Sequence, residues 1–68
     1  MKKGTVKWFN SEKGYGFIVQ DDGSQDIFIH ISEVEKAGLR SLKDGQKISY
    51  EAQENRGRQS ACNIALID

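Results

Sequence analysis

Short runs of alternating or β-branched residues, separated by polar turns, predict an all-β fold. Five strands are expected, over residues 5–10, 15–20, 26–31, 46–54 and 59–67. The capping-box pattern at 32–35 predicts one short helical turn that begins at Ser32. For a chain of 68 residues we favour a closed barrel over a sandwich, because closure removes exposed strand edges.

The third predicted strand alternates strictly between apolar and other residues, which is typical of a strand with one buried face. The face assigned to the core consists of Ile27, Ile29 and Ile31. Phe28 therefore shares the opposite face with Asp26 and His30, and this face is expected to meet solvent.

The same alternation places Tyr15 and Phe17 on one face of the second strand and Ile18 on the other. A hairpin across residues 21–25 would set Tyr15 and Phe17 beside Phe28 on one outer surface. Clustered aromatic side chains are costly to expose on a small monomer and usually mark a binding surface.

The first strand does not fit simple alternation. Phe9 is assigned to the core, because nothing in the pattern argues for its exposure. Trp8 would share a face with Val6, a core candidate, if the strand were regular. Either the strand is bulged or bent near Trp8, or Trp8 is partly buried.

Basic and acidic residues cancel, ten against ten, but they are distributed unevenly. Residues 18–35 hold five acids and no lysine or arginine, whereas the segments on either side are basic. This pattern fits a barrel with a basic and an acidic face, or an ordinary mixed surface. Lys7 and Lys13 flank the aromatic residues, and Arg56 lies in a neighbouring turn, so these cations are suited to binding phosphates.

Several kinds of site are excluded or unsupported. A single cysteine, Cys62, excludes an internal disulfide and a cysteine-based zinc site, and is expected to pack in the fifth strand. One histidine gives no metal-ligand spacing, and no phosphate-binding loop for ATP occurs. No apolar run is long enough to span a membrane, and no secretory signal precedes the first strand, so a cytoplasmic protein is expected.

Three motifs resemble the bacterial cold-shock protein family. They are Gly4-Thr5-Val6-Lys7-Trp8-Phe9-Asn10, Lys13-Gly14-Tyr15-Gly16-Phe17-Ile18 and Asp26-Ile27-Phe28-Ile29-His30-Ile31-Ser32. The second resembles the first ribonucleoprotein motif of that family, and the third resembles its second. The resemblance covers nearly the whole chain, so residues 1–68 are expected to be one cold-shock domain.

The resemblance implies a five-stranded antiparallel Greek-key barrel of the oligonucleotide-binding type. It implies a cytoplasmic, non-enzymatic monomer that binds single-stranded RNA and DNA and acts as an RNA chaperone in the cold-shock or stress response, with regulation of transcription or translation. It implies no cofactor, metal, membrane partner, small-molecule substrate or catalytic residue.

Carried over residue by residue, the resemblance also implies a binding site. The residues expected to stack on bases are Trp8, Tyr15, Phe17, Phe28 and His30. Lys7, Lys13 and Arg56 would contact phosphates, and Asn10 and Asp26 would form hydrogen bonds to base edges. Phe9, Ile31, Leu39 and Arg58 are further candidates.

The chain departs from the family pattern at three places. Ile31 and Leu39 stand where aromatic rings are usual, so a weaker site is expected, by about 1–2 kcal/mol for each lost ring. Arg58 replaces the proline that is usual in the last hairpin, and residues 59–63 make this hairpin one residue longer than the family pattern. Arg58 either contacts a phosphate or is simply solvated.

Two other functions were weighed against nucleic-acid binding. A small ribonuclease would need His30 to act with Lys13 or Asp26 as acid and base, and a complete pair is not evident. A barrel of this type can also bind sugars or proteins. The lysines beside the aromatic residues favour nucleic acid, because neutral sugars need no cations.

Overall fold

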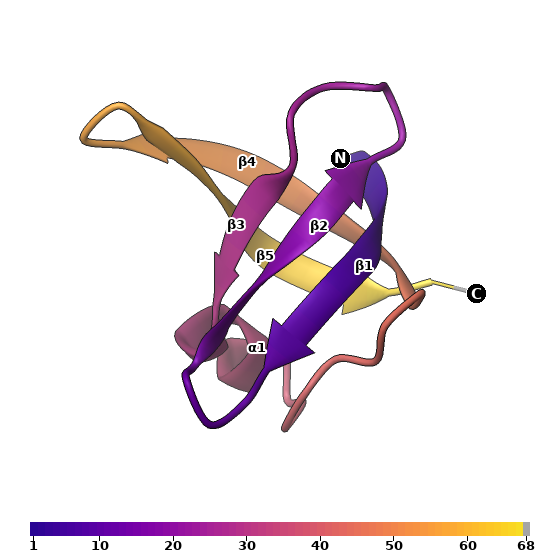
Figure 1. Ribbon diagram of the computed structural model, residues 1–68, viewed down its shortest axis with the longest axis vertical. Helices are drawn as coiled ribbons and strands as arrows, with labels where there is room; N and C mark the ends of the chain where they lie inside the picture. Colours follow the sequence, from indigo (N-terminus) through magenta and orange to yellow (C-terminus); the bar gives the residue numbers. More distant parts are fainter. Residues whose placement is uncertain (68) are drawn as a thin grey trace.

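The computed structural model describes residues 1–67, with the Asn55 side chain excepted. Its elements in chain order are β1 (Lys2–Asn10), β2 (Tyr15–Gln20), β3 (Ile27–His30), α1 (Ile31–Lys36), β4 (Lys47–Asn55) and β5 (Arg58–Leu66). The strands close into a barrel in the order β1-β2-β3-β5-β4 (Figure 1). The predicted five-stranded β-barrel is therefore confirmed.

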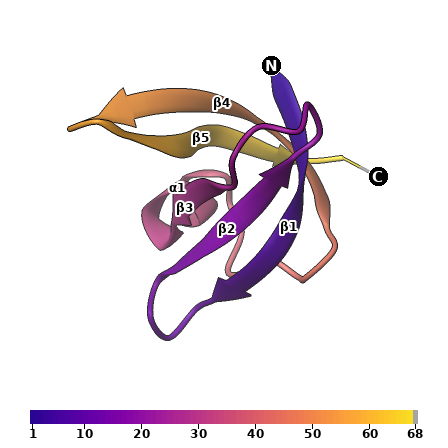
Figure 2. The same cartoon turned by 45° about the horizontal axis from the view of Figure 1, so that its top comes forward.

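Neighbouring strands run antiparallel except where the barrel closes between β3 and β5. That pair is parallel and meets at Phe28 and Ser60. The β4–β5 hairpin continues beyond this contact, and its turn projects past β3 (Figure 2). One side of the hairpin thus overlooks the outer face of β3.

The barrel interior is filled by aliphatic side chains and one tyrosine. The fully buried residues include Ile18 and Ile29, with no exposed surface, and Val6 and Ile27, with 1% exposed. Ile27 and Ile29 point inward as the alternation predicts. Phe9 is partly buried and packs against this core, in agreement with its assignment from sequence. Within residues 1–67, no helix has the length and apolar character needed to cross a bilayer.

The predicted inward position of Ile31 on the third strand is wrong. β3 ends at His30, and Ile31 begins α1, where it is only half-buried. The predicted helix cap at Ser32 is also wrong. His30 is the N-cap, because its ring Nδ1 accepts a hydrogen bond of 3.1 Å from the Ser32 backbone N–H. A ring nitrogen that satisfies the first helical turn allows the helix to start directly after the strand.

A β-bulge resolves the position of Trp8. Val6 pairs with Ile18, but Trp8 pairs with Phe17, so Lys7 is an extra residue in β1. The extra residue changes the parity of the strand. Val6 can therefore point into the core while Trp8 lies on the outer face, where it is half-buried.

A second bulge lies in the last hairpin. Ser49 pairs with Ala65 and Glu51 pairs with Cys62, so β5 carries one residue more than β4 between these pairs. Asn63, within this stretch, has a φ of 49°, a conformation that asparagine tolerates better than most residues.

Gly16 permits the close approach of β1 and β2. It pairs with Phe9, and a Cβ at this position would lie 2.4 Å from the Trp8 carbonyl oxygen and 2.7 Å from the Phe9 Cα. Both contacts are with backbone atoms of β1, so neither strand can relieve them by a side-chain rotation. The space that a side chain would need is occupied by the neighbouring strand.

We predict that Gly16→Ala lowers the free energy of unfolding by about 3 kcal/mol, because it overpacks the β1–β2 contact. Gly23→Asn is the control, since Gly23 lies in an open turn at φ +82° and its substitution should cost less than about 1 kcal/mol. Urea denaturation measures both values. Equal losses for the two variants would contradict the packing argument.

Candidate functional site

Five rings form a continuous layer on the outer face of β1, β2 and β3, here called the ring surface. It consists of Trp8, Tyr15, Phe17, Phe28 and His30. The Trp8 ring centroid lies 5.6 Å from that of Tyr15 and 5.4 Å from that of Phe17. Phe28 lies 5.8 Å from Tyr15 and 5.9 Å from Phe17, and 6.4 Å from His30.

Strand register explains why these rings gather. Phe17 is paired with Phe28, and Tyr15 with His30, while the bulge adds Trp8 from β1. His30 is exposed, and the other four rings are half-buried, so one part of each ring meets solvent and another meets a neighbouring ring. Edge-to-face contacts of this kind hold rings in place at little entropic cost. The structure thus brings together the stacking residues expected from the sequence.

Lys7 and Asp26 form an ion pair at the margin of the ring surface. The Lys7 Nζ lies 3.0 Å from the Asp26 Oδ2, and both side chains remain partly exposed. From the sequence the two residues have separate predicted roles, and their contact is not predicted. An exposed pair of this type contributes at most about 1 kcal/mol, so a phosphate can compete for the lysine.

Asn10 and Lys13 lie at the turn between β1 and β2, beside Tyr15. The Asn10 side-chain oxygen accepts a hydrogen bond of 3.0 Å from the Lys13 backbone N–H, which closes the turn. The turn thus uses one of the two lone pairs of the Asn10 side-chain oxygen. The Lys13 side chain is exposed.

An open groove of about 610 Å³ adjoins the ring surface where β3 meets β5. It is lined by Phe17, Gln25, Asp26, Phe28, Gly57, Arg58, Gln59 and Ser60. Arg58, left undecided from the sequence, is part of this lining, while Arg56 is exposed in the adjoining turn. Four lining residues are not predicted from the sequence: Gln25, Gly57, Gln59 and Ser60. The last three belong to the hairpin that meets β3, and a contact between segments so far apart in the chain has no local signal.

The remaining candidates lie outside the groove lining. Leu39 is half-buried and packs against the core, and Phe9 does likewise. Ile31 is half-buried at the start of α1. Cys62 is half-buried in β5, where burial and the nearby Glu51 carboxylate raise the pKa of its thiol. Among residues 1–67, no three His, Cys, Asp or Glu side chains are grouped to hold a metal ion.

Comparison with known proteins identifies close relatives. Residues 2–67 match the family described as the 'Cold-shock' DNA-binding domain. The chain is 65% identical over 66 residues to the probable cold shock protein y4cH of Sinorhizobium fredii, covering 94% of this chain and 96% of that protein. It is 54% identical over 66 residues to the cold shock protein CspA of Rhizobium meliloti, with the same coverage. It is 45% identical over 65 residues to the cold shock-like protein CspC of Shigella flexneri, covering 96% of this chain and 94% of that protein.

Proposed function

The chain belongs to the cold-shock DNA-binding domain family, and from this premise we propose that it binds single-stranded RNA and DNA by stacking bases on the ring surface. The observation that carries the proposal is the layer of five contacting rings left partly exposed on three adjacent strands. The core is already filled by other residues, so packing alone gives no reason for these rings to lie outside.

Stacking on such a layer is available only to unpaired bases. Each base presents a π-face to a ring, which is worth about 1–3 kcal/mol and depends little on base identity. In a duplex the same faces are covered by neighbouring base pairs. Ring stacking thus selects for single strands with modest sequence preference.

Cations on both sides of the ring surface complete the proposed site. Lys7 and Lys13 lie along β1 and its turn, and Arg58 lines the groove on the far side of Phe28. Arg56 adds a further exposed cation in the hairpin turn. We infer that a strand crosses the rings and enters the groove, with its phosphates directed toward these side chains.

The proposed cellular role is that of an RNA chaperone in the cold-shock or stress response. A protein that binds unpaired strands and not duplexes shifts RNA folding equilibria by mass action, without ATP. We propose that the domain works as a cytoplasmic monomer and that residues 1–68 form one functional unit. With Ile31 and Leu39 in place of rings, its site should be weaker than one that carries aromatic residues there.

We propose binding without catalysis. Within the described part of the chain, the His30 Nδ1 contacts the Ser32 hydroxyl and backbone N–H, and the Asp26 carboxylate contacts Lys7. These contacts give the His30 Nδ1 and the Asp26 carboxylate other partners, which supports binding over catalysis. Incubation of labelled RNA with the pure protein should leave the RNA intact, and cleavage that is lost in His30→Ala would favour the enzyme.

We predict that hexathymidine and hexauridine bind at least about tenfold more tightly than duplexes of equal length, because two stacked bases already supply this difference. Phe28→Ala should weaken binding of the single strands about tenfold, while Leu66→Ala, which removes an exposed apolar side chain on β5, should not. Isothermal titration calorimetry measures the affinities of the unmodified protein and of both variants. Equal affinity for strand and duplex would rule the proposal out.

Phosphate contacts predict a salt dependence. In a plot of the logarithm of the binding constant against the logarithm of the salt concentration, three or four phosphate contacts should give a slope of roughly −2 to −3. Lys13→Gln should make this slope less steep by about 0.7. Lys47→Gln is the matched control, since Lys47 begins β4, which does not pair with β2 or β3, and its ammonium group contacts Asp21 after β2. A slope near zero for the unmodified protein would show that the assigned cations do not meet phosphates.

A further inference from the structure

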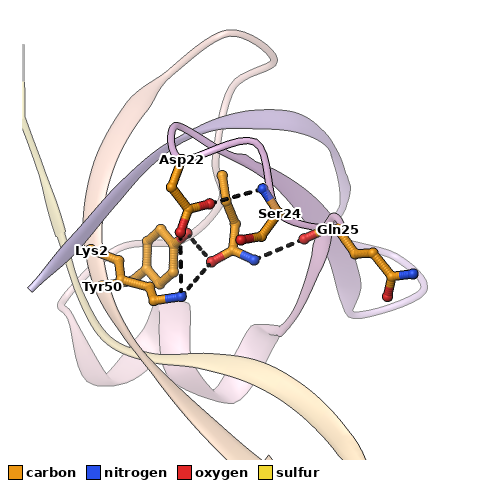
Figure 3. A network of polar contacts seen from close by, with 6 residues as sticks. Lys2, Asp22, Ser24, Gln25 and Tyr50 are labelled. Carbon is orange, nitrogen blue, oxygen red and sulfur yellow. Dashed lines mark hydrogen bonds and ion pairs between the residues drawn. The ribbon is translucent and has the colours of Figure 1, made fainter.

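A buried hydrogen-bonded chain links β4 to the loop that borders the groove. The Tyr50 hydroxyl donates to the Gln20 Oε1 at 2.7 Å, and the Gln20 Nε2 donates to the Gln25 carbonyl oxygen at 2.8 Å. Tyr50 has no exposed surface and Gln20 only 4%. Figure 3 shows this network, with Lys2 and Asp22 beside Tyr50 and with Ser24 and Gln25 at its other side.

The chemistry of the three groups determines which atom donates and which accepts in each hydrogen bond. The Gln25 carbonyl oxygen can only accept, so the Gln20 amide must turn its Nε2 toward it and its Oε1 toward Tyr50. Burial, with smaller contributions from Asp22 and Asp21, raises the pKa of Tyr50 to about 12. The hydroxyl therefore remains a donor at neutral pH, and hydrogen bonds shielded from water hold their geometry more firmly than exposed ones.

The tethered residues belong to the groove. Gln25 and its neighbour Asp26 line it together with Phe17 and Phe28. The loop residues 21–26 are all exposed, and their ion pairs with Lys2, Lys7 and Lys47 are exposed as well. Such pairs hold a loop weakly. The Gln20 amide adds a buried attachment directly at the groove wall.

We propose that Gln20 and Tyr50 are positioning residues for nucleic-acid binding: they hold the Gln25 carbonyl, and with it the groove wall formed by residues 25 and 26, in the shape that receives a single strand. The inference rests on the proposed function. A wall fixed before binding loses less conformational entropy when the ligand arrives, which raises affinity without any new contact.

Three variants test the proposal: Gln20→Met, Tyr50→Phe and the double substitution. Gln20→Met frees the Gln25 carbonyl and should weaken hexathymidine binding about three- to tenfold, which corresponds to the loss of one hydrogen bond. Tyr50→Phe should have a smaller effect in the same direction, because the Gln20 amide keeps its bond to Gln25. It also serves as the test if Gln20→Met does not fold.

The double variant separates positioning from stability. It leaves neither partner of the Tyr50–Gln20 bond buried and unpaired, so its urea midpoint should recover relative to Gln20→Met. Its affinity should not recover, because the Gln25 carbonyl remains free. Ile48→Val, a buried β4 substitution outside the chain of bonds, is the control and should lower stability while leaving affinity unchanged. Affinity that follows stability across all four variants would overturn the proposal.

Backbone amide NMR of the free protein tests whether Gln20 holds the loop, whatever the outcome of the binding experiments. In Gln20→Met the order parameters of the Gln25 and Asp26 amides should fall, and the Asp26 amide signal should shift, because it follows the released carbonyl. If the unmodified protein fails to bind hexathymidine, the proposed function is wrong, and these signals still decide whether the tether exists. Unchanged order parameters in Gln20→Met would overturn the positioning role.

Discussion

One extra residue in β1 determines how the binding face is built. Lys7 shifts the register, so the strand can direct Val6 into the core and Trp8 outward within three positions. Without the shift, strict alternation would force one of the two onto the wrong face. The Lys7 Nζ lies 3.0 Å from the Asp26 carboxylate. This one extra residue therefore positions both the Trp8 ring and the Lys7 cation of the proposed site.

The other half of the proposed site depends on closure of the barrel. Parallel pairing of β3 with β5 at Phe28 and Ser60 brings the last hairpin beside the ring surface and creates the groove. The buried Gln20–Tyr50 pair then connects β4 to the loop at the groove wall. A small domain thereby uses most of its strands to shape one face.

Alternation of apolar and polar residues predicted the features that are determined within one strand. Alternation gave the inward positions of Ile27 and Ile29 and the outward position of Phe28. It failed at Ile31, because the His30 ring caps α1 and ends the strand one residue early. The Lys7–Asp26 pair and the lining by Gln59 and Ser60 depend on contacts between distant segments, which carry no signal in a single sequence.

The central claim is that bases stack on the ring surface, and Trp8 is the only indole in the chain. Titration of its fluorescence with hexathymidine tests the claim most directly. The account predicts quenching that saturates at the stoichiometry and affinity found by calorimetry. Binding detected by calorimetry while Trp8 emission stays unchanged would place the ligand elsewhere and contradict the account.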